Sequence, residues 1–204
     1  MTKYFMSGTP LAELERIMMT PPRPHYRNAP SYISGLARQP NGKEAVYWQL
    51  VKKTFPGLSS GELWQRIREV SRGKETSQFL NKVHGKRMTD FCLDLWKGMN
   101  GKPSSPWLAA IFLLTSSEKL WSCARGCIHC YGIDFGHIVL GSVSLQEYVL
   151  YQSARSIWDA YSCISVADLA DRRLVEDSTL SLIVDAAVIS RYGTVRFPDE
   201  KEAE

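Results

Sequence analysis

Three cysteines near the middle of the chain have residue types and a spacing that could bind a metal ion. Cys123, Cys127 and Cys130 lie close together, with His129 and His137 beside them. Zinc prefers thiolate and imidazole ligands, and four of them must converge on one ion. However, the i, i+4, i+7 spacing is also typical of the buried face of a helix, and free cysteine is often buried. We therefore expect no cofactor, and these three thiols are the metal candidates.

Nucleophilic catalysis is not indicated by the sequence. A catalytic nucleophile needs a base within hydrogen-bonding reach, and that base needs an orienting group. The four histidines, His25, His84, His129 and His137, have unrelated local contexts. The sequence also lacks the Gly-x-Ser-x-Gly, phosphate-binding loop, His-Glu-x-x-His and dinucleotide-binding motifs. We expect a protein that is not an enzyme and has no catalytic residues.

Basic residues are concentrated between residues 52 and 87, and they are the candidate binding residues. The set comprises Lys52, Lys53, Arg66, Arg68, Arg72, Lys74, Lys86 and Arg87. Trp48, Trp64 and Phe79 are interleaved with them. Lysine and arginine neutralise phosphates and release the counterions that surround nucleic acids. The pattern indicates a site for nucleic acid or for an acidic protein surface, and a solvated basic face is the alternative.

The charge of the whole chain is divided between its two halves. Residues 1–102 carry 17 Lys and Arg against 8 Asp and Glu, whereas residues 103–204 carry 8 against 13. The formal net charge of +4 therefore hides a basic half and an acidic half. This division is typical of a protein that docks on a polyanion or on an acidic partner.

The apolar residues that must position these side chains recur with the period of a helix from Lys43 onward. Ser59 with Glu62, and Ser144 with Glu147, have the spacing of capping boxes. Residues 107–114 are apolar all round, which predicts a buried central helix. A last helix is predicted over about residues 178–191, with Gly193 as its stop. The fold class is therefore all-α: an irregular bundle of about eight helices around a buried central helix.

Two segments allow other interpretations. Residues 79–83 indicate a short helix of their own, and residues 132–141 a loop or short extended piece. Residues 164–170 resemble the first helix of a helix-turn-helix, with residues 178–189 as its second helix. The connection between them is long and acidic, and the second helix opens without a base-reading Arg, Asn or Gln.

The chain is predicted to contain three parts. Residues 1–30 form a short helix and a Pro-rich linker, residues 31–102 a basic helical half, and residues 103–204 an acidic helical half that packs with it as one globular unit.

The N-terminus has no signal peptide, the longest apolar run of eight residues is too short to span a bilayer, and the five cysteines are an odd number. We expect a cytoplasmic protein with free thiols and no membrane partner.

Parts of the sequence resemble accessory proteins of conjugative elements and phages of gut Firmicutes. At the N-terminus the matching residues are 5–16 and 18–22. Further along, the matching segments are residues 110–114, 120–121, 133–135, 150–152, 168–171 and 191–193. The resemblance implies a setting, a small accessory gene of a mobile element, and carries no functional residues with it.

That setting leads to two functional hypotheses. Small accessory proteins of mobile elements often bind host defence machinery, and CRISPR inhibitors are one such class. The leading hypothesis is an inhibitor of a host CRISPR-Cas nuclease that binds the effector protein or its nucleic acid. Its acidic half would act as a nucleic-acid mimic, or its basic half would hold guide RNA or DNA. The alternative is a DNA-binding accessory or regulatory protein for element transfer.

Overall fold

The computed structural model describes residues 43–97 and 103–193. All of them belong to one compact unit within Pro40–Glu204. The predicted N-terminal helix and linker of residues 1–30 lie outside the described residues. Within those residues, none of the helices is both long enough and apolar enough to cross a membrane.

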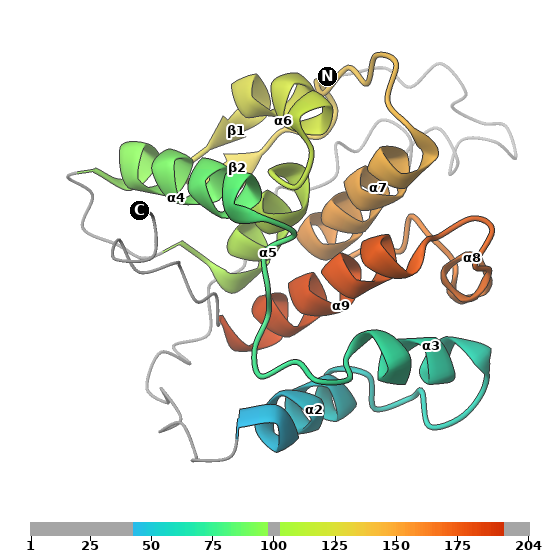
Figure 1. Cartoon of the computed structure of the whole chain (residues 1–204). Coiled ribbons are helices and arrows are strands. Elements are labelled where there is room, and N and C mark those ends of the chain that lie inside the picture. The colour runs from blue at the N-terminus through green and yellow to red at the C-terminus, as the bar shows by residue number, and fades with distance from the viewer. Residues whose placement is uncertain (1–42, 98–102, 194–204) are drawn as a thin grey trace, which may run out of the picture. The chain divides into compact units, whose positions relative to one another are not determined.

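The described residues contain eight α-helices, which confirms the all-α, irregular bundle (Figure 1). The helices are α2 (Lys43–Thr54), α3 (Glu62–Val70), α4 (Lys82–Trp96), α5 (Ser105–Leu114), α6 (Glu118–Ala124), α7 (Leu145–Asp159), α8 (Val166–Ala170) and α9 (Asp177–Tyr192). A 3-10 turn, η1 (Arg125–Cys127), follows α6 and leads into a small hairpin of β1 (Ile128–His129) and β2 (Gly132–Ile133). The two strands are antiparallel, with Ile128 opposite Ile133.

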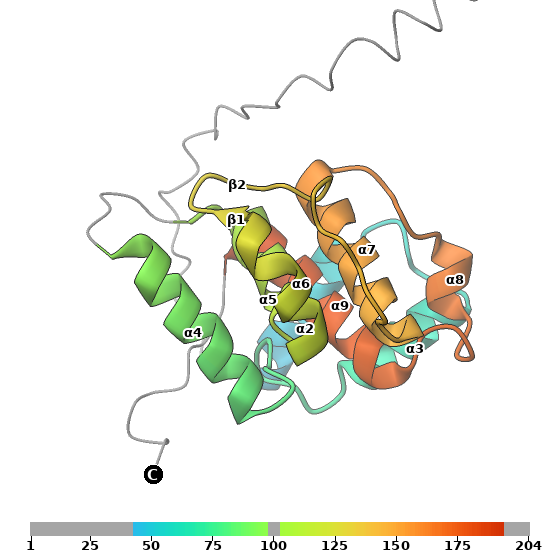
Figure 2. The same cartoon turned by 90° about the horizontal axis from the view of Figure 1, so that it is seen from above.

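Helix α5 is the buried central helix that the sequence predicts. Ser104 caps it by accepting a hydrogen bond from the backbone N–H of Trp107, and proline stands in its first turn. Every residue from Ala109 to Leu114 is completely buried. Helices α6, α7 and α9 contact it from different sides (Figures 1 and 2). A helix that is apolar on all sides is stable here because its neighbours cover every face.

Helix α9 is the second buried helix, and it joins the two halves of the sequence. One side of α9 packs on α5 and α7, whereas α2 and α3 contact it from the opposite end of the unit (Figure 1). Gly193 ends the helix in the left-handed conformation, with a φ of 70°. Because the residues of α9 are buried on several faces, it cannot enter a DNA groove as the second helix of a helix-turn-helix.

Some local predictions were wrong. Ser59 does not cap α3, because the helix begins only after Gly61, which makes no side-chain cap bond. Residues 79–83 do not form a separate helix, since Asn81 caps the longer α4. In the second half, Ser117, Ser144 and Ser165 each accept a capping bond from the backbone of the helix that follows.

Candidate nucleic-acid interface

Arg66, one of the eight basic candidates, is buried and holds α3 against α8 and the start of α9. Its side chain is 1% exposed. Nη2 donates to Asp177 Oδ1 at 2.7 Å and to the carbonyl oxygen of Val175 at 2.6 Å. Nη1 donates to the carbonyl oxygen of Leu169 at 2.7 Å. A guanidinium with these partners serves the fold, so we leave Arg66 out of the interface.

Lys74 is also committed to the fold. Its ammonium donates to Ser181 at 2.5 Å and to the carboxylate of Asp185 at 2.7 Å. Asp185 also accepts a hydrogen bond from the hydroxyl of Tyr47, and both of these residues are buried. Burial raises the pKa of Asp185, and the positive charge of Lys74 opposes that effect. The cluster fastens α2 and the segment that follows α3 to α9.

Arg87 lies on the side of α4 that faces α5 and α6. It donates to the carbonyl oxygen of Thr115, and its Nη2 donates to Glu118 Oε2 at 2.5 Å. Its side chain is 12% exposed. Arg87 therefore joins Arg66 and Lys74 as a cation that the fold uses internally.

His84, which lies on α4 one turn before Arg87, is a neutral histidine in the core. The backbone N–H of Leu80 donates to its Nδ1 at 3.1 Å, so the ring proton must lie on Nε2. Nε2 then donates to the carbonyl oxygen of Phe112 at 2.8 Å. Burial lowers the pKa of His84 to about 4. The ring is thus fixed between two backbone groups and has a structural role.

Ion pairs between the two halves of the sequence neutralise part of the charge that the sequence divides between them. Arg66, Lys74 and Arg87 of the basic half pair with Asp177, Asp185 and Glu118 of the acidic half. Other carboxylates of the acidic half are bound by nearby arginines, by a histidine or in helix caps. These are Asp134, Glu147, Asp159, Asp168 and Asp171. Within residues 103–193, the described part of the acidic half, most carboxylates are therefore already bound and do not resemble the free phosphates of a nucleic-acid backbone.

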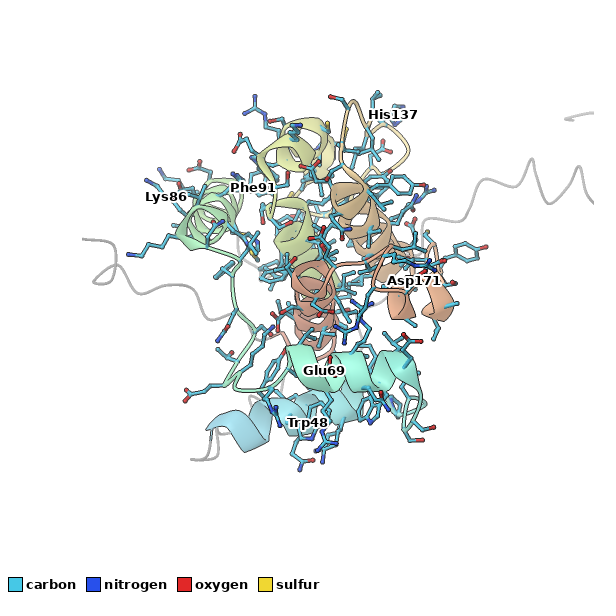
Figure 3. The ribbon with its side chains drawn as sticks, turned by 45° about the vertical axis from the view of Figure 1, so that its right-hand side comes forward. Trp48, Glu69, Lys86, Phe91, His137 and Asp171 are labelled. Atoms are coloured by element: carbon cyan, nitrogen blue, oxygen red, sulfur yellow. The ribbon has the colours of Figure 1, made fainter. Side chains whose placement is uncertain are left out.

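Four of the remaining candidates lie together on the α2–α3 end of the unit. Lys52 and Lys53 occupy the last turn of α2, Arg68 the last turn of α3, and Arg72 follows it by one turn. All four are exposed, and within the described chain none of them forms an ion pair. Lys86, the eighth candidate, is exposed on α4, and Figure 3 places it far from Trp48 on α2. The structure thus separates Lys86 from the other four.

A pair of tryptophans lies between these cations. The indole rings of Trp48 on α2 and Trp64 on α3 are 5.2 Å apart between centroids and tilted by 35°. Both side chains are half-buried. Lys52 is one helical turn beyond Trp48, and Arg68 is one turn beyond Trp64, so each cation shares a helix face with an indole. We call Trp48, Lys52, Lys53, Trp64, Arg68 and Arg72 the α2–α3 surface.

The third interleaved aromatic residue, Phe79, is not part of this surface. Its ring contacts Phe112 at 5.6 Å between centroids and His84 at 5.0 Å. Phe79 therefore packs toward the central helix.

The described residues do not bring the three candidate cysteines together as a metal site. Helix α6 ends at Ala124, so Cys127 lies in η1 and Cys130 in the turn of the hairpin, and the helical spacing is lost. Among residues 43–97 and 103–193, no three metal-binding side chains converge. All three thiols are free and partly buried.

Sequence reasoning missed the cluster of Tyr47 and Asp185, although a signal for it exists. Asp185 is the single charged residue in the otherwise apolar segment 182–189. A lone charge in such a segment needs a buried partner, because an unpaired buried carboxylate is costly. For Arg66 the signal is its place on the apolar stripe of Leu63 and Ile67.

Comparison of the chain with protein-family models, curated proteins and solved structures finds no match. The fold and the α2–α3 surface are therefore interpreted from their own geometry. They define an all-α protein with one aromatic and basic surface whose cations are not used by the fold.

Proposed function

We propose that this protein is a non-catalytic nucleic-acid-binding protein that acts through the α2–α3 surface. One observation carries the proposal. Three basic candidates are consumed by internal ion pairs, whereas Lys52, Lys53, Arg68 and Arg72 stay exposed around two indoles. Lysine and arginine bind phosphates and gain free energy from counterion release. Unpaired cations beside aromatic rings are the combination that backbone binding with base stacking requires.

The alternative, in which the acidic half acts as a mimic of nucleic acid, has less support. A mimic of nucleic acid needs carboxylates that are free to meet a basic channel. Here Asp177 and Asp185 are held by cations of the same chain, and Glu147 is held in a capping box. We therefore favour binding of nucleic acid over imitation of it.

The resemblance to mobile-element proteins leads to a narrower proposal. In that setting, the nucleic acid is the one handled by a host CRISPR-Cas nuclease, and the protein is an inhibitor of that nuclease. A DNA-binding protein for element transfer uses the same surface without an effector. Affinity purification from a CRISPR-bearing lysate, with and without nuclease treatment, separates the two. Capture of a Cas effector from the untreated lysate supports the inhibitor, and loss of that effector on nuclease treatment shows that nucleic acid bridges the two. Capture of DNA without a Cas effector in either sample argues against the inhibitor.

The general proposal is tested by reversing charge on the surface. The double variant Arg68→Glu/Arg72→Glu should bind a labelled oligonucleotide at least about tenfold more weakly at low salt, because two phosphate contacts become repulsive. Lys119→Glu/Arg125→Glu is a matched control. Both of its residues are exposed, lie near α6 and η1, and change the net charge equally. Equal loss in both double variants would show that net charge alone matters and would reject the surface.

A further inference from the structure

We infer that the α2–α3 surface takes single-stranded nucleic acid in preference to a duplex. The inference rests on the proposed function and specifies its ligand. It follows from three features of the surface: the paired indoles, the placement of the cations around them, and the way α3 is held by its neighbours.

The paired indoles offer a ring surface that an unpaired base can use. Trp48 and Trp64 contact each other, and both residues stay partly exposed to solvent. In a duplex the faces of the bases are stacked on one another, and only the base edges are accessible in the grooves. An unpaired base has a free face that can stack on an indole, and such stacking tolerates any sequence.

The cations lie on both sides of the tryptophan pair. Figure 1 shows α3 running back over α2 in the opposite direction. Lys52 follows Trp48 by four residues and Arg68 follows Trp64 by four residues, which is about 6 Å along each helix axis. Because the two helices run in opposite directions, Lys52 and Arg68 lie on opposite sides of the tryptophan pair. A strand can then place a base on the indoles and its flanking phosphates on Lys52 and Arg68.

The neighbours of α3 make it a poor reading helix for a duplex. A helix enters the major groove with its exposed face and flanks free. In α3, Leu63, Arg66 and Ile67 are buried, and Trp64 is against α2. Glu69, labelled in Figure 3, is bound by Arg172 on the side of α8. Neighbouring elements therefore cover several sides of α3, so that it does not stand free as a reading helix does.

The indoles are also held in place from beneath. Tyr47, the neighbour of Trp48, is bonded to Asp185, and Arg66, two residues after Trp64, is bonded to Asp177. A platform fixed in this way loses little conformational entropy when a base stacks on it.

The test compares three probes on the intact protein. These are a short poly-dT strand, a hairpin duplex with the same number of phosphates, and the same strand with abasic sites in place of bases. We expect the poly-dT strand to bind most tightly. The abasic strand should bind about tenfold more weakly or worse, because it keeps the phosphates and loses the stacking. This comparison changes only the ligand and therefore cannot be confused with misfolding.

A variant of the protein gives the complementary test. Trp48→Leu/Trp64→Leu keeps apolar volume and removes the aromatic faces, and it should lose about tenfold in affinity for poly-dT. Trp158→Leu is the control, since Trp158 is also half-buried but lies on α7. Circular dichroism and the melting temperature establish that each variant is folded.

The outcomes separate the inference from the proposed function. Equal or tighter binding of the duplex overturns the preference for single strands, and equal binding of the abasic strand overturns the base stacking on which that preference rests. Either result leaves nucleic-acid binding in place. Binding of none of the probes rejects the proposed function, and the inference with it. Tighter binding of poly-dT that depends on Trp48 and Trp64 supports both.

Discussion

Tyr47 donates its hydroxyl hydrogen to the carboxylate of Asp185, a residue 138 positions further along the chain. Each of the two side chains is 1% exposed. The bond fastens α2, near the start of the described residues, to α9, the last helix among them. Because Trp48 is the next residue after Tyr47, the same bond supports the α2–α3 surface from within.

Replacing Tyr47 by phenylalanine should lower the free energy of unfolding by about 1–3 kcal/mol. The buried carboxylate of Asp185 would lose one of its donors and could not regain it from water. Urea denaturation measures the change. Tyr148→Phe, at a site on α7 that is 45% exposed, should change stability by less than about 0.5 kcal/mol. Equal effects at the two sites would contradict a special role for the buried bond.

Arg66 and Arg68 should behave as opposites, although only one residue separates them. Arg66→Ala should destabilise the protein by about 2–4 kcal/mol, because two carbonyl oxygens lose their donor and Asp177 keeps only Arg172 as an ion-pair partner. Arg68→Ala should leave stability within about 0.5 kcal/mol of wild type and weaken oligonucleotide binding. Thermal denaturation and anisotropy titration measure the two effects. A stable Arg66→Ala protein with impaired binding would return Arg66 to the interface.

Affinity for a single strand should fall with salt in proportion to the number of cations on the α2–α3 surface. Four phosphate contacts predict a slope of about −3 for the logarithm of the binding constant against the logarithm of salt concentration. Removing Lys52 and Lys53 together should reduce the slope by about half. A slope that is unchanged in this double variant would place the phosphates elsewhere.

Protonation of His84 should destabilise the protein in mild acid. The pKa of His84 is about 4 in the folded protein and about 6.5 when unfolded, so below pH 6.5 the unfolded state binds more protons. The contribution of His84 is therefore fully present above pH 6.5 and is lost between about pH 6.5 and 4, a change of about 3 kcal/mol. His84→Gln removes this titration. The difference between the two unfolding profiles isolates His84 from the carboxylates, and a constant difference over this range would refute the prediction.

The fold class could be predicted because its signals are local. The capping box of Ser144 and Glu147, the stop at Gly193 and the uniformly apolar segment of α5 each depend on a few neighbouring residues. Ser59 misled the prediction of the start of α3, because Gly61 has a φ of 95° and the helix begins after it. The hairpin at Ile128–Ile133 was too short to show an alternating pattern.

The candidate site could be predicted only in part, because residues far away in the sequence decide which of the cations are paired within the fold and which stay exposed. In the sequence the eight cations look alike. Asp177 and Asp185, which remove Arg66 and Lys74 from the surface, lie more than 100 residues away from them. The contact of Trp48 with Trp64 likewise depends on how α3 turns back over α2, which no local pattern specifies.

The ion pairs between the halves join residues that are synthesised at different times. Arg66, Lys74 and Arg87 are synthesised well before Asp177, Asp185 and Glu118, their partners in the finished protein. A nascent chain that has reached residue 102 therefore carries these three cations bare, together with those of the α2–α3 surface. It therefore carries more unpaired positive charge than the completed molecule, in which carboxylates of the second half pair with these three cations.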